Sequence, residues 1–166
     1  MKNKSKIVIL VTGGTFDKEY NEITGKLFFS ESHIKEMLKL GRCRIKVDIK
    51  NLMLKDSLDM EKIDRKLILD ACLRTSANKI VITHGTDTMT KTAKLLSENI
   101  KDKTIVFTGA MIPYKFGASD GLFNLGSALT ATQILNHGIY IAINGNLFNW
   151  NEVKKNQKKG VFESTY

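Results

Sequence analysis

The chain contains little proline and little cysteine. Its 166 residues include one proline, Pro113, and two cysteines, Cys43 and Cys72. Repeats, low-complexity tracts and linker-like segments are also absent from the sequence, which argues against a modular or fibrous protein. The two cysteines have neither metal-ligand nor redox spacing. We therefore expect them to be buried apolar side chains and not a disulfide.

Long hydrophobic runs are absent as well. The apolar runs have the length of strands, far below the about 20 residues that cross a membrane as a helix. The basic start Met1–Lys6 precedes the apolar run Ile7–Val11, as in a secretory signal peptide. That run stops at Thr12-Gly13-Gly14, which is too short for a typical secretory core. We therefore expect a cytoplasmic protein with no membrane partner.

Acidic residues are outnumbered, with 17 Asp and Glu against 26 Lys and Arg, a formal net charge of +9. Such a charge can attract nucleic acid or anionic substrates. However, the basic residues are scattered, no aromatic stacking platform alternates with them, and no nucleic-acid-binding motif is present. The densest cluster is Lys154, Lys155, Lys158 and Lys159. We interpret the charge as a solvated lysine-rich surface and expect no nucleic-acid partner.

The remaining features indicate one α/β domain. At 42% hydrophobic and 26% charged residues, the composition is ordinary for a globular chain with a substantial core. Segments rich in β-branched residues alternate with segments of helical periodicity, which predicts an α/β fold. The expected strands are residues 6–12, 44–50, 79–83, 104–108 and 138–143. The expected helices are residues 31–40, capped by Ser30; from Asp59 to about 75; 88–99; and from Ser119-Asp120-Gly121 to about 136.

Several local expectations complete this outline. Residues 13–30 form a loop with a small hairpin, and residues 54–60 form a second loop. Asn144-Gly145 between two apolar segments predicts a two-residue β-hairpin turn. The polar tail from Asn151 onward is expected to cross the surface. The inward face of the second helix is expected to carry Ile63, Leu67, Leu69 and Cys72.

Two threonine motifs stand where predicted strands end. Val11-Thr12-Gly13-Gly14-Thr15 follows Ile7–Leu10, and Thr83-His84-Gly85-Thr86-Asp87-Thr88 follows Ile80–Ile82. In open parallel sheets, ligands bind at the carboxyl edge of the strands. Two threonine-bearing loops at that edge suggest a hydroxyl nucleophile beside a polar cradle. Thr108-Gly109-Ala110-Met111 is a third loop at the same edge.

The residues by themselves leave the roles open. Thr15 is equally well a structural loop residue, and Asp87 or Thr86 equally well caps the following helix. His84 has no paired carboxylate or second histidine in view, so we assign it neither as a base nor as a metal ligand. A threonine nucleophile needs a base, which a lysine positioned by a carboxylate can supply. Thr86, Asp87 and one lysine would form such a set, but the motif does not choose the lysine.

Four motifs together resemble the bacterial-type L-asparaginase family, in the family's order and over nearly the whole chain. They are Thr12-Gly13-Gly14-Thr15, His84-Gly85-Thr86-Asp87-Thr88, Thr108-Gly109-Ala110-Met111-Ile112-Pro113 and Ser119-Asp120-Gly121-Leu122-Phe123-Asn124-Leu125. Asp56-Ser57-Leu58-Asp59-Met60 is similar to the family's substrate-binding serine loop. The resemblance implies the N-terminal, catalytic domain alone, over residues 1–166, as a short form without the smaller C-terminal domain. It implies a three-layer, flavodoxin- or Rossmann-like single domain with a mostly parallel sheet.

The resemblance implies hydrolysis of the side-chain amide of asparagine, or of a related small amide, through a threonine acyl-enzyme. Thr15 is the implied nucleophile, and Thr86 with Asp87 and a lysine forms a second catalytic set. Lys154 matches that lysine best, and Lys155 is a near rival. Neither a metal ion nor an organic cofactor is implied. Two alternatives are a non-catalytic protein that binds asparagine or aspartate and an amidase subunit of a larger assembly.

The resemblance also implies the substrate contacts. Ser57, Gly85 and Asp87 would hold the α-carboxylate and α-amine of the amino acid, and the carbonyl of Ala110 would face the leaving nitrogen. The family has a tyrosine that closes over the substrate, and Tyr20 is its match here, although Tyr20 comes only five residues after Thr15. In the family the second domain helps build the site across a dimer interface. For the short form we expect either self-association that covers the site or weak activity on free asparagine. Of the oligomers, a homodimer is favoured, because two-fold pairs are the commonest.

Overall fold

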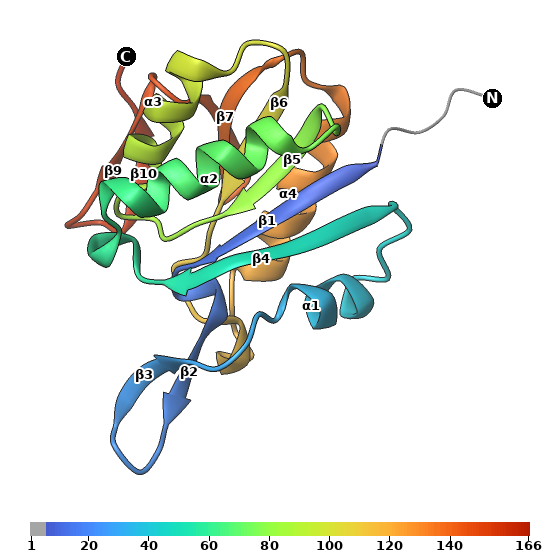
Figure 1. The fold of residues 1–166 in the computed structure, drawn as a ribbon. Coiled ribbons are helices and arrows are strands. Elements are labelled where there is room, and N and C mark those ends of the chain that lie inside the picture. Colours follow the sequence, from blue (N-terminus) through green and yellow to red (C-terminus); the bar gives the residue numbers. More distant parts are fainter. Residues whose placement is uncertain (1–5) are drawn as a thin grey trace.

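A six-stranded sheet forms the centre of the computed structural model, which describes residues 6–166 (Figure 1). Its strand order is β4-β1-β5-β6-β7-β8, in which the first five strands pair in parallel and β8 runs antiparallel to β7. The strands are β1 Ile7–Gly13, β4 Val47–Lys55, β5 Lys79–Thr83, β6 Thr104–Thr108, β7 Gly138–Ile143 and β8 Asn146–Asn149. Residues 1–5, on which the expectation about a signal peptide partly rests, lie outside the described residues.

Helices cover both faces of this sheet. Helices α2 (Lys62–Arg74) and α3 (Met89–Asn99) lie on one face, and α1 (Ile34–Leu40) and α4 (Gly121–Ile134) lie on the other (Figure 1). The predicted three-layer α/β architecture with a mostly parallel sheet is therefore confirmed. Four of the five predicted strands begin and end within one residue of the observed strands, and β4 is the exception.

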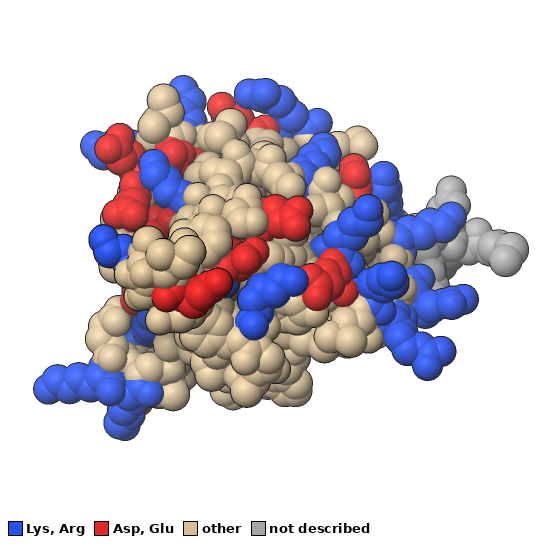
Figure 2. Space-filling view, turned by 90° about the horizontal axis from the view of Figure 1, so that it is seen from below, with Lys and Arg blue, Asp and Glu red and all other residues tan. Residues whose placement is uncertain are grey.

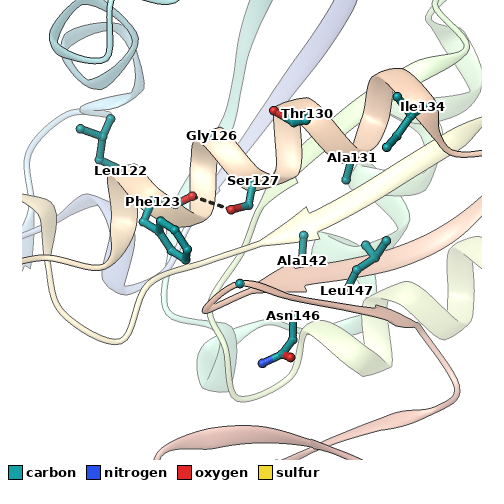
Figure 3. Close-up of a pocket in the computed structure, with 11 residues that line it drawn as sticks. Leu122, Phe123, Gly126, Ser127, Thr130, Ala131, Ile134, Ala142, Asn146 and Leu147 are labelled. Carbon is teal, nitrogen blue, oxygen red and sulfur yellow. Dashed lines mark hydrogen bonds between the residues drawn. The ribbon is translucent and has the colours of Figure 1, made fainter.

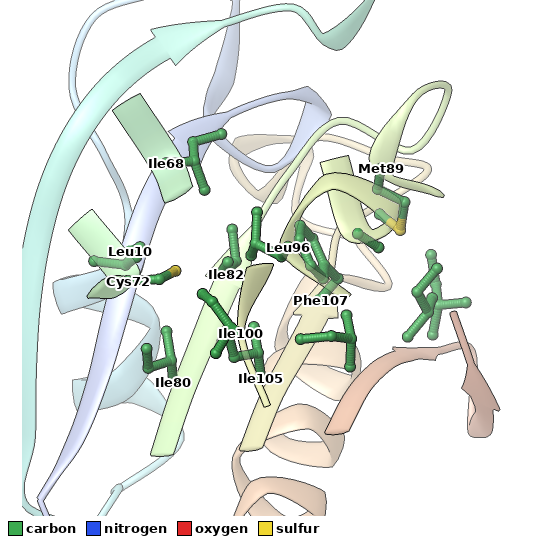
Figure 4. Close-up of a cluster of buried hydrophobic side chains, with 14 of the residues drawn as sticks. Leu10, Ile68, Cys72, Ile80, Ile82, Met89, Leu96, Ile100, Ile105 and Phe107 are labelled. Carbon is green, nitrogen blue, oxygen red and sulfur yellow. The ribbon is translucent and has the colours of Figure 1, made fainter. Parts of the chain in front are cut away.

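The alternation of side chains along β1 explains why its sequence is apolar throughout. Ile7, Ile9 and Val11 pack against α1 and α4, whereas Val8 and Leu10 pack against α2 and α3. Figure 4 shows the hydrophobic cluster that contains Leu10, in which side chains from the sheet meet those of α2 and α3. A strand buried on both faces has no polar side to present, so a continuous apolar run identifies it.

Two helices begin later than the sequence predicted. Helix α1 starts at Ile34, because the Asp17 carboxylate accepts the backbone N–H of His33 at 2.9 Å, in place of a cap by Ser30. Helix α2 starts at Lys62, and its first turn is closed by a capping box of Glu61 and Asp64, not by Asp59.

The inward face of α2 also differs from the expected one. Ile68 and Cys72 are fully buried, whereas Ile63 and Leu67 are exposed. The expectation that Ile63 and Leu67 face inward was therefore wrong. Both cysteines are free thiols, Cys72 buried and Cys43 partly buried, in agreement with the expectation of no disulfide.

Short hairpins account for most of the remaining chain. The hairpin predicted within residues 13–30 is present as β2 (Lys18–Asn21) and β3 (Lys26–Phe29). The predicted turn between β7 and β8 is also present, with φ of 49° at Asn144 and 81° at Gly145. The tail, for which the sequence predicted only a path across the surface, forms a further hairpin of β9 (Val153–Asn156) and β10 (Val161–Ser164).

Charged side chains of both signs are spread over the face of the molecule seen in Figure 2. Figure 2 shows Lys and Arg side chains toward both ends of the face seen from below, with acidic side chains and uncharged surface between them. Among residues 6–166, no helix has the length and apolar character needed to cross a membrane.

Candidate functional site

Three loops meet at the carboxyl edge of the sheet, after β1, β5 and β6. Thr12 Oγ1 donates a hydrogen bond of 2.7 Å to the carbonyl of Thr83, which ties the end of β1 to the end of β5. The backbone N–H of His84 donates to the carbonyl of Thr108 at 2.9 Å, which ties β5 to β6. The expectation that the threonine loops share one edge is therefore confirmed.

Glycine allows two of these loops to touch through their backbones. A Cβ atom on Gly14, whose φ is 78°, would lie 2.5 Å from the Cα of Gly85. A Cβ atom on Gly85 would in turn lie 2.6 Å from the Cβ of Ser57. Only glycine permits such approaches. Thr15 and Thr86 directly follow these two glycines, so the contact brings their loops together around Ser57.

Lys155 connects the second threonine motif to the C-terminal hairpin. Its Nζ atom donates hydrogen bonds of 2.7 Å to Thr86 Oγ1 and 2.7 Å to Asp87 Oδ1. The Lys155 side chain is 12% exposed and that of Asp87 is 27% exposed, so the ion pair is shielded from most solvent. Thr86 is buried. A hydroxyl, an amine and a carboxylate therefore form one connected group.

The preference for Lys154 over Lys155 was wrong, and the geometry of β9 explains why. Successive side chains of a strand point to opposite faces. Val153 and Lys155 share the buried face, and Lys155 lies opposite the buried Phe162 of β10. Lys154 is exposed on the other face, opposite Glu163. The alternation after Val153 was a usable signal, but it required the tail to be recognised as a strand.

Gln157 is a site residue that the sequence analysis missed. Its Nε2 atom donates to Asp87 Oδ1 at 3.1 Å, so this carboxylate oxygen accepts from both Gln157 and Lys155. Gln157 lies in the turn between β9 and β10, and it carries no motif of its own. Only the docking of this hairpin beside the β5 loop reveals its contact.

Ser57 lies on the loop that touches Gly85. It is 1% exposed, and its hydroxyl oxygen has no hydrogen-bond partner within residues 6–166. The neighbouring Asp56 forms an ion pair with Lys18 of β2, a contact that the sequence analysis did not find. Burial favours a higher pKa for Asp56, but the bonds from Lys18 and from the N–H of Leu58 outweigh it and lower the pKa. The serine loop is thus held between the hairpin and β5.

His84 is a buried neutral residue of the scaffold. Its Nδ1 atom lies 2.8 Å from the carbonyl of Gly85, and its Nε2 atom lies 2.8 Å from Thr92 Oγ1. Complete burial lowers its pKa to about 4. Both ring nitrogens therefore have structural partners, and the geometry offers His84 no role as a proton acceptor for a ligand.

The third loop carries Ala110, which is buried. The carboxylate of Asp120 accepts the backbone N–H groups of Met111 at 3.0 Å and Ile112 at 3.1 Å. Asn124 donates to the carbonyl of Gly109 at 2.8 Å. Through Asp120 and Asn124, the motif of residues 119–125 therefore holds the backbone of this loop from the start of α4.

The structure does not bring Tyr20 to the threonines. Tyr20 lies on β2, its side chain is 54% exposed, and its ring meets Phe116 edge-on at 6.5 Å. Within the described part of the chain, no hydrogen bond joins Tyr20 to Thr15, Thr86 or Lys155.

A groove of about 540 Å³ lies elsewhere, between α4 and the β7–β8 hairpin (Figure 3). None of the residues lining it is charged, and the Ser127 hydroxyl donates to the carbonyl of Phe123 within α4. This groove has no charged group that could activate its hydroxyls, so the threonine loops are the stronger candidate. Residues 6–166 contain no cluster of three or more His, Cys, Asp or Glu side chains arranged to hold a metal ion.

Comparison with known proteins gives the same family along the whole described chain. The family description "Asparaginase, N-terminal" matches residues 6–164. A glutaminase-asparaginase of Acinetobacter glutaminasificans is 30% identical over 165 residues, covering 92% of this chain and 50% of the relative. An L-asparaginase of Thermococcus kodakarensis is 31% identical, covering 94% of this chain and 49% of the relative. The chain thus spans about half the length of these relatives.

Solved structures agree with this match. The thermostable L-asparaginase of Thermococcus kodakarensis superposes with a TM-score of 0.84 at 30% identity, over 96% of this chain and 51% of that protein. L-asparaginase I of Vibrio cholerae also gives a TM-score of 0.84, at 28% identity, over 97% of this chain and 51% of that protein.

Proposed function

Because this chain belongs to the asparaginase family, we propose that it hydrolyses the side-chain amide of asparagine, or of a related small amide, to the acid and ammonia. The observation that carries the proposal is the contact of Lys155 Nζ with Thr86 Oγ1 and Asp87 Oδ1, both at 2.7 Å. A hydroxyl in contact with an amine that a carboxylate orients is the arrangement that activates a weak oxygen nucleophile.

The proposed reaction proceeds in two steps. The Thr15 oxygen attacks the amide carbon and its proton passes to the amide nitrogen, so that the C–N bond breaks and ammonia leaves. Water then attacks the threonyl ester, and Thr15 regains its proton as the acid departs. In both steps, Thr86 and Lys155 form the path along which the proton moves, and Asp87 keeps Lys155 in place. Backbone N–H groups near Thr15 and Thr86 would stabilise the oxyanion.

The proposed substrate contacts surround the same loops. The Ser57 hydroxyl, buried and without a partner among the described residues, would donate to the substrate carboxylate. The backbone of Gly85 and the carboxylate of Asp87 would hold the carboxylate and the α-amine, respectively. The carbonyl of Ala110 would accept from the leaving nitrogen. Free amino-acid amides are therefore the favoured class of substrate.

Two further relatives bear on the assembly and the cellular location of this chain. One relative is a subunit of the glutamyl-tRNA(Gln) amidotransferase from Methanococcus vannielii, 29% identical over 87% of this chain. A structural neighbour from Campylobacter jejuni is titled a probable cytoplasmic L-asparaginase. We propose a cytoplasmic homodimer. A subunit of a larger assembly is the alternative that the native mass tests.

Ammonia release by the pure chain tests the activity, with asparagine, glutamine, short asparaginyl peptides and α-N-acetylasparagine as substrates. Thr15→Ala and Thr86→Ala are expected to lower turnover by orders of magnitude while the fold persists. Thr130→Ala, an exposed threonine on α4, serves as the control and is expected to leave turnover unchanged.

Near-normal turnover in either folded site variant would remove that threonine from the mechanism. If α-N-acetylasparagine reacts as fast as asparagine, Asp87 does not bind the α-amine. Binding of aspartate without ammonia release from any of the substrates would favour the non-catalytic alternative.

A further inference from the structure

We propose that Arg65 is a positioning residue that locks the Ser57 loop and the Gly85 loop into one substrate-binding surface. This inference rests on the proposed function, because it assigns Arg65 to the amino-acid-binding half of that site. Arg65 lies on α2, behind the loops, and it belongs to none of the motifs found in the sequence.

The Arg65 guanidinium reaches two threonines of the β5–α3 segment. Its Nη1 atom donates to Thr92 Oγ1 at 2.6 Å, and its Nη2 atom donates to Thr88 Oγ1 at 3.1 Å. Nη2 also lies 3.4 Å from the carbonyl of Met60, just past the serine loop. A planar, forked donor is suited to holding two oxygens at once, and a lysine ammonium does not reproduce its geometry.

The first branch runs from Arg65 through Thr88 to the serine loop. Thr88 Oγ1 donates to the carbonyl of Ser57 at 2.8 Å. A hydroxyl has one proton, so a Thr88 oxygen that donates to Ser57 can only accept from Arg65. The guanidinium therefore fixes the direction of the Thr88 hydroxyl and, through it, the peptide group of Ser57.

The second branch runs through Thr92 and His84 to the Gly85 loop. The carbonyl of Gly85 only accepts, so the His84 Nδ1 atom at 2.8 Å must carry the ring proton. Burial lowers the pKa of His84 to about 4, so the ring is neutral and Nε2 accepts from the Thr92 hydroxyl at 2.8 Å. The Thr92 oxygen then accepts from Arg65.

Both branches thus end on residues proposed to hold the substrate, Ser57 and Gly85. These residues touch, since a Cβ atom on Gly85 would lie 2.6 Å from the Ser57 Cβ. No hydrogen bond within residues 6–166 links Arg65 to Thr86, Asp87 or Lys155. Loss of Arg65 should therefore loosen substrate binding more than it slows the chemical step.

The test replaces Arg65 by methionine and by lysine and measures KM and kcat for ammonia release from asparagine. Arg74→Met is the matched control, because Arg74 lies on the same helix, is exposed, and among residues 6–166 forms an ion pair only with Asp70. We expect KM to rise at least about tenfold in Arg65→Met, the size associated with lost hydrogen bonds from a charged donor. We expect kcat to change by less than about threefold, since the loss falls on binding. Arg65→Lys should rescue only part of the loss, and the control should match the parent chain.

A second measurement does not depend on activity. Nitrogen NMR of ¹⁵N-histidine-labelled protein should show His84 in the Nδ1–H form with a hydrogen-bonded Nε2, and this Nε2 signal should shift in Arg65→Met but not in Arg74→Met. If the parent chain releases no ammonia, the proposed function fails while this arm still tests the network.

Unchanged KM in a folded Arg65→Met variant, a fall in kcat without a rise in KM, or an unshifted His84 signal would overturn the proposal. If Arg65→Met does not fold, Thr88→Val and Thr92→Val carry the test. Thr88→Val should raise KM, and Thr92→Val should shift the His84 signal. Thr132→Val is their control, a buried threonine whose hydroxyl donates within its own helix.

Discussion

Lys155 and Lys154 are adjacent in the sequence but have different surroundings. Lys155 lies against Thr86 and Asp87, whereas the Lys154 side chain is exposed opposite Glu163. The difference comes from the alternation of side chains along β9. The pair therefore offers a nearly ideal comparison, with the same residue type and the same strand but opposite faces.

We expect Lys155→Met to lower kcat by about 10²-fold or more, because the proposed proton path loses its amine. Lys154→Met should change kcat by less than about twofold, since an exposed charge contributes little to a site on the other face. Steady-state ammonia release measures both. A larger loss of kcat in Lys154→Met than in Lys155→Met would assign the proposed role to Lys154.

His84 makes stability depend on pH. Its pKa is about 4 in the folded chain, below the ordinary value of 6.5, because burial disfavours the charged ring. The unfolded chain therefore binds more protons between these values. The stability from neutral His84 is fully present above pH 6.5 and is lost as the pH falls toward 4.

Urea unfolding at pH 7 and pH 5 tests this linkage. We expect the free energy of unfolding to fall by about 2 kcal/mol more in the parent chain than in His84→Gln, which lacks the titrating ring. His137→Gln, the same substitution at an exposed histidine, serves as the control. If the free energy of unfolding falls equally between pH 7 and pH 5 in the parent chain and in His84→Gln, the linkage is contradicted.

At the scale of elements, the β9–β10 hairpin brings a C-terminal segment to a site built from the first two thirds of the chain. Val153 and Phe162 are each 7% exposed and join the cluster between the sheet and helices α2 and α3. These two side chains anchor the strand that carries Lys155. The stability of the hairpin and the placement of the lysine are therefore coupled.

We expect Phe162→Ala to lower the free energy of unfolding by about 3 kcal/mol, the cost of removing a buried aromatic ring. It should also lower kcat, because Lys155 lies directly opposite Phe162. Val161→Ala, a half-exposed neighbour, is expected to change stability by about 0.5 kcal/mol or less. Loss of stability with an unchanged kcat would show that Lys155 is held without this ring.

At the scale of the whole molecule, the threonine loops lie at an edge of the sheet, with Thr15 and Asp87 partly exposed. A site open to water gains less from electrostatic stabilisation than a covered one. A two-fold pair is the commonest oligomer, which supports the proposed homodimer.

Sedimentation over a concentration series, with the ammonia assay run on the same samples, tests this proposal. We expect a transition from monomer to dimer, with turnover per chain rising as the dimer forms. A strictly monomeric chain that is highly active at low asparagine concentrations would show that the site needs no cover from a second copy.

The sequence by itself determined the features that depend on neighbouring residues. Runs such as Ile80–Ile82 identify strands because both faces of a parallel sheet are buried. Asn144-Gly145 identifies its turn because both positions need positive φ, and the observed angles of 49° and 81° satisfy this. The threonine motifs at strand ends located the candidate site for the same reason, since strand ends can be read locally.

Only the tertiary structure decided which side chains complete the site. Lys155 and Asp87 are 68 positions apart, and Arg65 and Thr92 are 27 apart. A step of one residue in β9 exchanges Lys155 for Lys154, and the way α2 packs on the sheet leaves Ile63 exposed while Arg65 reaches the loops. Local patterns do not fix these outcomes, because the face that an element buries depends on how it packs against segments that are distant in the sequence.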